Sequence, residues 1–208
     1  MYLRTEGIIL KRKNFGEADR IVTIYTRDFG KVSCLAKGVR RPRSKKAGHI
    51  ELGNWCKLFI AKGKNLDLLT EVEQKRAFGI EDFSEEKANK IYHLLELVNE
   101  LTGEHEKNLH VFILLAQFLK KCNQNDKNFG IVSSVFKVKL MSLLGFFSAK
   151  SLTDSKAKSI FELLEDEEME TIESRIKFSK ESNLKLLTFL DSMIENIIQS
   201  KLRTSRFL

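Results

Sequence analysis

Proline and cysteine are both scarce in this sequence. One proline and 11 glycines in 208 residues exclude collagen-like repeats and argue against long linkers or disordered tails. The three cysteines, Cys34, Cys56 and Cys122, are odd in number and widely spaced, so they offer neither a disulfide framework nor a Cys-x-x-Cys metal knuckle. We interpret them as small buried residues of a protein in a reducing compartment.

Long apolar runs are missing as well. The longest stretches, such as Val111–Ala116, fall far short of the roughly 18 residues that a membrane span needs. The first residues lack the apolar region of a signal peptide, so nothing indicates export. The sequence therefore predicts a cytoplasmic protein that does not bind a membrane.

Catalytic motifs are also lacking. There is no Walker loop, no Gly-x-Gly-x-x-Gly and no Gly-x-Ser-x-Gly elbow. His105 and His110 are five residues apart, which does not fit a His-Glu-x-x-His zinc site. The acidic run 165–168 is more simply explained as solvated surface than as a metal site. We expect no catalytic residue, no bound metal and no cofactor, and hence no enzyme.

Positive charge, in contrast, is abundant and is confined to one part of the chain. Residues 1–80 hold 18 Lys and Arg against 8 Asp and Glu, whereas residues 81–208 hold 18 against 20. The first part therefore accounts for the basic character of the whole chain. Such asymmetry indicates a polyanionic partner for the first part, with nucleic acid ahead of an acidic membrane surface.

The first part has the pattern of short strands separated by turns. Five segments are rich in β-branched and aromatic residues and are bounded by turn residues. They are 7–11, 20–26, 32–36, 50–61 (with a candidate break at Gly53) and 66–75. Five strands with no long helix between them suit a small closed barrel such as the OB-fold, although the pattern alone also fits an SH3-like barrel.

From Ser84 onward, apolar residues recur at three- and four-residue steps, which indicates helices. Ser84 is expected to cap the first helix, and Gly103 to end it. Four further helices are expected around 109–119, 132–144, 160–164 and 186–197. The sequence thus predicts an α+β protein, in which a five-stranded OB-fold barrel (1–78) is followed by an α-helical domain (79–208), the two being joined near 78–83.

The sharpest local feature is a cationic segment between the third and fourth expected strands. Six of the ten residues 37–46 are Lys or Arg, none is acidic, and the only proline, Pro42, lies among them. Crowded like charges repel one another unless a polyanion neutralises them, and arginine can grip phosphate oxygens and stack on bases. We therefore expect a DNA-binding loop rather than a merely solvated one. The cations expected to bind DNA are Lys37, Arg40, Arg41, Arg43, Lys45 and Lys46, with Arg20 of the second strand.

Barrels that bind single strands also present aromatic rings, because every base has a face that can stack. The candidates are Phe15, Tyr25, Trp55 and Phe59, and we include Tyr25 and Trp55 among the expected DNA-binding residues. Alternation along the fourth strand places Trp55 and Phe59 on one side and sends Cys56, Leu58 and Ile60 into the barrel interior. An outward aromatic residue could instead pack against the helical domain.

Three segments of the first part stand out as a set. They are Glu6–Lys11, Phe15–Thr26 with its Gly-Glu-Ala-Asp-Arg core, and Phe29–Ser44 with Ala-Lys-Gly-Val-Arg-Arg-Pro-Arg-Ser. Together they resemble the N-terminal signature of the RecO family of DNA repair proteins, which are recombination mediators. The likeness is strong over residues 1–76 and thins afterwards to 136–145 and 202–208.

The resemblance implies a nucleoid-associated protein that binds single-stranded DNA, with double-stranded DNA as a further candidate ligand. It also implies annealing of complementary strands, cooperation with RecR, contact with the tail of the single-strand-binding protein SSB, and loading of RecA onto SSB-coated DNA. Many family members carry a four-cysteine zinc module after the helix that here ends near Gly145. Residues 146–155 contain no cysteine, so we expect that module to be absent.

An acidic tail with an apolar last residue, such as the family resemblance implies for SSB, needs an apolar groove with cations at its rim. Four lysines flank the apolar second and third helices and are our candidates for that rim: Lys120, Lys121, Lys137 and Lys139. Two other functions stay open. One is a general RNA-binding or translation-associated OB-fold protein, and the other is a DNA-processing enzyme, for which the sequence offers no metal cluster.

Overall fold

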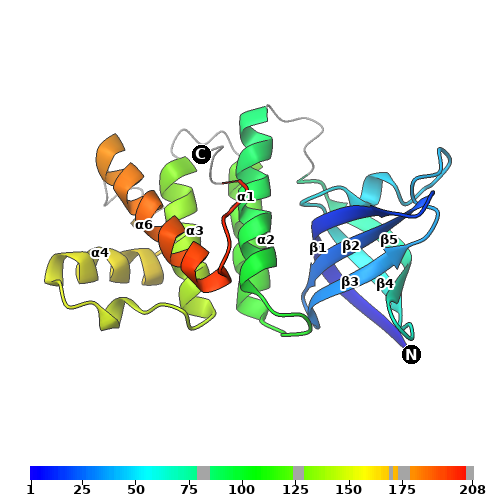
Figure 1. Cartoon of the computed structure of the whole chain (residues 1–208), viewed down its shortest axis with the longest axis horizontal. Coiled ribbons are helices and arrows are strands. Elements are labelled where there is room, and N and C mark those ends of the chain that lie inside the picture. Colours follow the sequence, from blue (N-terminus) through cyan, green and yellow to red (C-terminus); the bar gives the residue numbers. More distant parts are fainter. Residues whose placement is uncertain (79–84, 124–128, 169–170, 173–178, 205–208) are drawn as a thin grey trace. The chain divides into compact units, whose positions relative to one another are not determined.

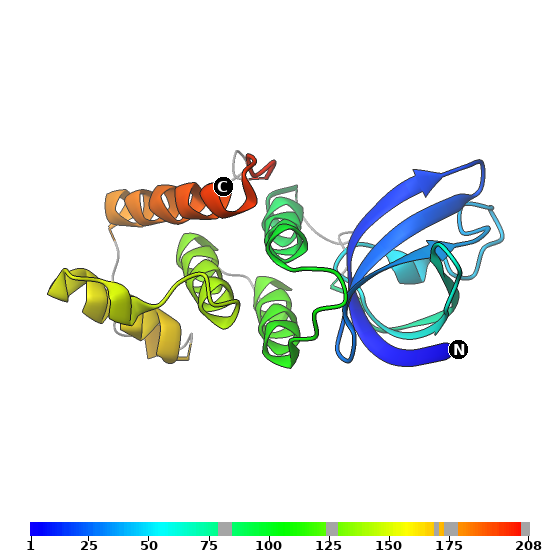
Figure 2. The same cartoon turned by 60° about the horizontal axis from the view of Figure 1, so that its bottom comes forward.

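The computed structural model describes residues 1–78, 85–123, 129–168, 171–172 and 179–204. The chain divides into two compact units, Met1–Asn123 and Gln124–Leu208. The first unit holds a β-barrel and two helices, and the described part of the second unit is helical (Figures 1 and 2). The domain division expected at residue 78 stays a prediction, and the first compact unit continues beyond it to Asn123.

Residues 1–78 form a closed barrel of five strands, arranged in the order β1-β2-β3-β5-β4. Neighbouring strands are antiparallel except β3 and β5, which are parallel and meet at only two residue pairs, Cys34 with Asp67 and Leu35 with Leu68. This arrangement is that of an OB-fold, so the predicted fold class is confirmed over the SH3-like alternative. The strands are β1 (Tyr2–Phe15), β2 (Asp19–Thr26), β3 (Gly30–Ala36), β4 (Trp55–Ala61) and β5 (Asp67–Arg76).

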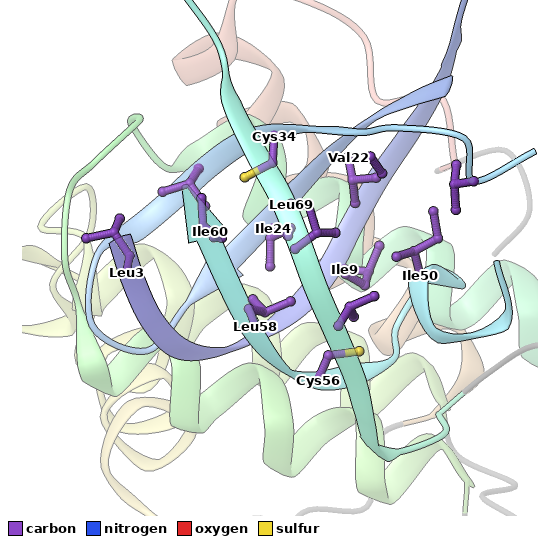
Figure 3. Packing of buried hydrophobic residues seen from close by; sticks show 14 residues of the cluster. Leu3, Ile9, Val22, Ile24, Cys34, Ile50, Cys56, Leu58, Ile60 and Leu69 are labelled. Atoms are coloured by element: carbon purple, nitrogen blue, oxygen red, sulfur yellow. The ribbon is translucent and has the colours of Figure 1, made fainter. Parts of the chain in front are cut away.

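Alternation along the strands builds the barrel core. On β4 the side chains of Cys56, Leu58 and Ile60 are buried, as predicted, while those between them are more exposed. Each fully buried aliphatic side chain contributes about 1.5–3 kcal/mol to stability. The buried core, part of which Figure 3 labels, consists of Leu3, Ile9, Val22, Ile24, Val32, Cys34, Ala36, Val39, Ile50, Cys56, Leu58, Ile60, Leu69 and Val72.

Two strands, β1 and β4, differ most from the expected segments. β1 begins at Tyr2, earlier than expected, and continues past a bulge between Ile9 and Lys11. The fourth strand begins at Trp55 rather than at Ile50, because Ile50 ends a short 3-10 helix, Gly48–Ile50, and residues 51–54 are not part of a strand. The reason is local: Gly53 has a φ of +79°, which an extended strand does not allow.

Two helices complete the first unit: α1 (Glu85–Leu101) and α2 (Leu109–Asn123). The loop between them packs on the turn between β2 and β3. The Lys31 ammonium donates to the carbonyl oxygens of Asn99 (2.6 Å) and Thr102, and the His105 amide donates to the Lys31 carbonyl at 2.9 Å. A helix C-terminus is a favourable place for a cation, because the last carbonyl groups lack partners within the helix. The helical hairpin is thus joined to the barrel.

The second unit contains α3 (Phe129–Leu143), α4 (Ser155–Asp166) and α6 (Lys180–Ile198). α3 packs against both α4 and α6, and residues 131–138 of α3 are all buried. Asp154 caps α4 by accepting a hydrogen bond from the Ala157 amide, and Ser179 caps α6 by accepting one from Ser182. The helices expected in this region are therefore present. The N-cap expected at Ser84 and most of the expected junction 78–83 lie outside the described residues.

A membrane-spanning helix would be long and apolar. None of the helices in the described ranges combines the two properties to the degree that a span requires.

Candidate nucleic-acid interface

The cationic segment forms the connection between β3 and the 3-10 helix, as predicted, and it folds back onto the turn between β1 and β2. The Arg40 amide donates to the Ala18 carbonyl at 2.8 Å, and the Arg40 guanidinium donates to the Gly16 carbonyl at 3.2 Å. The Gly38 amide donates to the Asp19 carboxylate at 2.7 Å. Two segments separated by about twenty residues in the sequence thus form one surface.

The backbone of the loop is held in place by its own residues. Gly38 adopts a φ of +64°, which reverses the chain, and the next side chain, Val39, is buried in the barrel core. Two turn hydrogen bonds follow, from the Arg41 amide to the Gly38 carbonyl and from the Ser44 amide to the Arg41 carbonyl. The Lys46 ammonium donates to the Leu69 carbonyl at 3.4 Å. The loop is therefore an ordered platform from which charged side chains project.

The positive charge of this platform is not neutralised by the chain itself. Across the described ranges, none of the six cations in 37–46 takes part in an ion pair. Five of them are exposed, and Lys46 is half-buried. We name this loop, together with residues 11–20 of the β1–β2 hairpin, the basic surface.

The hairpin adds two lysines that the sequence did not assign to the site, and it also holds the predicted candidates Phe15 and Arg20. Lys11 and Lys13 are exposed on β1, and Phe15 at the end of β1 is 50% exposed. Arg20 lies in the same hairpin and donates to the Asn14 side chain at 3.2 Å. Arg12 is not available, because it pairs with Glu51. The sequence could have assigned the two lysines to this site only if the contact between Gly16–Asp19 and the loop had been predicted. No short motif indicates that contact.

Tyr25 has to be removed from the candidate interface. Its side chain is 0% exposed, and its hydroxyl donates to the Asn108 carbonyl at 3.3 Å, in the loop before α2. Burial raises the pKa of Tyr25 to about 12, with the Glu106 carboxylate acting in the same direction. A ring enclosed in this way has no free face for a base, so the prediction for Tyr25 was wrong.

Trp55 has a packing role in the structure. Its indole NH donates to the Glu6 carboxylate at 3.0 Å, and its ring meets the Phe112 ring of α2 edge-on at 5.5 Å. The Lys75 ammonium lies 5.2 Å from the centre of the indole. These contacts join β4 to the helical hairpin and include no residue of the basic surface. A DNA-binding role for Trp55 remains a prediction.

The four lysines expected at one rim are divided between the two compact units. Lys120 and Lys121 are on α2, and Lys120 is exposed. Lys137, on α3, is 0% exposed and pairs with Asp191 of α6 at 2.6 Å. The prediction for Lys137 was therefore wrong, because a buried ammonium cannot line a surface groove. Lys139 is half-buried and donates to the Glu165 carbonyl at 2.8 Å.

The side chains that could support catalysis or bind a metal ion either have structural roles or lie far from one another. Throughout the described part of the chain, no three His, Cys, Asp or Glu side chains gather where they could hold a metal ion. Cys34, Cys56 and Cys122 have buried side chains. In the acidic run 165–168, the Glu165 carboxylate accepts hydrogen bonds from the Ser142 hydroxyl and the Ala149 amide.

The OB barrel and its unneutralised cations define a class: an OB-fold protein with an exposed basic surface. Comparison with known sequences identifies the family within that class. The pattern of the family described as Recombination protein O N terminal matches residues 1–78, and that of Recombination protein O C terminal matches residues 91–148. The chain belongs to the RecO family.

Several relatives carry the name DNA repair protein RecO. The chain is 36% identical to that of Chloroherpeton thalassium over 148 residues, which cover 70% of this chain and 57% of the relative. It is 33% identical to that of Rubrobacter xylanophilus over 144 residues, covering 69% and 57%, and 30% identical to that of Acetivibrio thermocellus over 145 residues, covering 70% and 58%. The match thus spans a little over half the length of these relatives.

Proposed function

We propose that this chain is a recombination mediator in DNA repair that binds single-stranded DNA through its basic surface and promotes annealing of complementary strands. The observation that carries the proposal is the ordered loop 37–46, whose six cations form no ion pair across the described residues. Family membership supports a DNA partner over another polyanion, because the relatives are named as DNA repair proteins.

The mechanism is physical rather than chemical. Lysine and arginine side chains neutralise phosphates and release the counterions condensed on the strand, which favours binding at low salt. Two strands repel each other through their phosphates, and a protein that lowers this charge lets complementary bases meet. The ring of Phe15, which is exposed in the same hairpin as Lys11 and Lys13, would stack on a base.

The proposal includes partners. As a mediator, the chain would act with RecR, contact the SSB tail, and help RecA onto SSB-coated DNA in the cytoplasm, at the nucleoid. For the SSB tail, Lys120 and Lys121 of α2 remain the candidates, with Lys139 as a weaker one because its ammonium already binds the Glu165 carbonyl. Anisotropy of a labelled tail peptide with wild type and with Lys120→Glu/Lys121→Glu tests this contact; equal affinities place the contact elsewhere.

The DNA interface is tested by the salt dependence of binding. The variant Arg40→Ala, Arg41→Ala, Arg43→Ala, Lys45→Ala and Lys46→Ala should bind single-stranded DNA weakly. About four phosphate contacts at roughly 0.7 each predict that it loses a slope of about 3 in log K against log salt. An unchanged slope would remove the loop from the interface.

A matched control removes five exposed or half-exposed lysines outside the barrel: Lys107, Lys150, Lys156, Lys158 and Lys185. It lowers the net charge of the chain equally and should keep the wild-type slope. Annealing of complementary DNA, with and without RecR, distinguishes the mediator from the rival RNA-binding function. A preference for structured RNA together with no effect on annealing would favour that rival.

A further inference from the structure

An aromatic pair lies on the outer face of β1 and β4, away from the basic surface. Tyr2 and Phe59 stack with their ring centres 5.2 Å apart and an interplanar angle of 1°. The Arg4 guanidinium carbon lies 5.1 Å from the centre of the Phe59 ring. Tyr2 is 66% exposed although it is a large ring, and Phe59 is partly exposed. We call Tyr2, Arg4 and Phe59 the stacked patch.

The two surfaces are at opposite ends of β1. The stacked patch is at its start, where Arg4 is opposite Phe59 in register, and the basic surface includes its last residue, Phe15. In Figures 1 and 2 the start of β1, marked N, and the hairpin that follows β1 lie at different ends of the barrel. One ligand segment on the basic surface therefore leaves the stacked patch free.

The chemistry of the stacked patch differs from that of the basic surface. Within the described chain Arg4 forms no ion pair, so its charge is available to a ligand. The neighbouring cations Lys57 and Lys62 are paired with Glu73 and Asp67. A further carboxylate, Glu71, is opposite Phe59 in register and is exposed. The patch thus offers flat rings and one free cation, which suits a base with a single phosphate better than a long run of phosphates.

We propose that the stacked patch is a second binding site for single-stranded DNA, in which a base stacks on the open face of Tyr2 and Arg4 meets its phosphate. The inference rests on the proposed function, since it gives one barrel a place for a second strand segment during annealing. Binding at the stacked patch gains mostly from stacking, so it should depend little on salt, unlike binding at the basic surface.

The test compares Tyr2→Ala with Tyr2→Phe, which keeps the ring face and serves as the matched control. Binding of a short labelled dT oligonucleotide is measured in the five-alanine loop variant, where the basic surface is disabled. Tyr2→Ala should weaken the remaining binding roughly 10-fold without altering its salt slope, and Tyr2→Phe should leave it unchanged. In the chain with an intact loop, titration should give two short oligonucleotides per chain, and one with Tyr2→Ala.

Failure of this proposal can be told apart from failure of the proposed function. If the loop variant loses its salt slope but Tyr2→Ala changes neither affinity nor stoichiometry, the second site is wrong and the first stands. Photocrosslinking of the wild-type protein to DNA that contains 5-iodouracil gives an independent readout, because it does not depend on whether a variant folds. Adducts in the peptides that hold Tyr2 or Phe59 support the site. If adducts form at Phe15 but not in these peptides, the second site is wrong. It is also wrong if Tyr2→Ala weakens binding to a partner protein and leaves binding to DNA unchanged.

Discussion

Gly30 has no side chain, and this allows two parts of the first unit to come into close contact. It lies at the start of β3 with a φ of +66°, and a Cβ atom built there would be 2.2 Å from the Glu106 carbonyl oxygen. The chain between α1 and α2 therefore approaches the β2–β3 turn as closely as a backbone can. Tyr25, which binds the Asn108 carbonyl, and Lys31, which binds the end of α1, strengthen the same contact.

We expect Gly30→Ala to lower the free energy of unfolding by at least about 3 kcal/mol, because backbone strain and a steric clash add together. Gly16→Ala is the matched control, since Gly16 also has a positive φ (+56°) but nothing lies within 4 Å of the added carbon. It should cost only about 1–2 kcal/mol. Urea unfolding measures both, and equal costs for the two variants would contradict the close contact.

At the scale of elements, the sequence predicts the strands and helices well because their periods follow from burial. The two-residue alternation of Cys56, Leu58 and Ile60 identifies the inner face of β4 without a structure. The same alternation cannot say what covers the outer face of a barrel. Tyr25 points outward yet is enclosed by the loop before α2, a contact across more than eighty residues. A period also gives no sign of the break ahead of β4, which the sequence indicates only through Gly53 itself.

Lys137 shows a second limit, which concerns helices. Its position beside an apolar stripe is typical of a solvated lysine, and only the packing of α6 on α3 reveals a buried ion pair. Burial lowers the pKa of Lys137, and Asp191 opposes part of that shift. Between this lowered pKa and the usual lysine value the unfolded chain binds more protons, so the stability contribution of Lys137 rises as pH rises through that window.

Removing one member of this pair should therefore cost more than removing both. Lys137→Met leaves the mostly buried Asp191 carboxylate unpaired and should lower the free energy of unfolding by about 3 kcal/mol. Lys137→Met with Asp191→Leu should recover most of that loss, and it should also remove the rise in stability at alkaline pH. Thermal melts across pH check both expectations; a double variant less stable than the single one would show that the pair is net stabilising.

At the scale of the whole molecule, the first compact unit ends at Asn123, whereas composition and the family pattern both suggest a boundary at residue 78. The change in charge and in period occurs where the barrel strands stop, so the sequence marks that point. The sequence cannot show that the loop before α2 contacts the outward Tyr25 or that α2 contacts Trp55. The basic loop was predictable because six cations within ten residues need no tertiary information.

We expect a fragment of residues 1–123 to fold cooperatively and a fragment of residues 1–78 to be less stable by roughly 3 kcal/mol or more. The shorter fragment exposes the Tyr25 ring, whose full burial is worth about 1.5–3 kcal/mol, and it removes the Phe112 contact of the half-buried Trp55 ring. Fluorescence of Trp55, the sole tryptophan, follows urea unfolding of both fragments. Equal midpoints would mean that the barrel is independent of the helical hairpin and would support a domain boundary at residue 78.

The basic loop also has a consequence for the free protein. Its six cations repel one another whenever no strand is bound, and no carboxylate of the described chain pairs with them. Added salt screens that repulsion, so it should stabilise the unbound barrel, whereas it should weaken the proposed binding to DNA. The conditions that best preserve the fold would then be those in which the proposed binding is weakest, and phosphates bound at the loop would relieve the same repulsion.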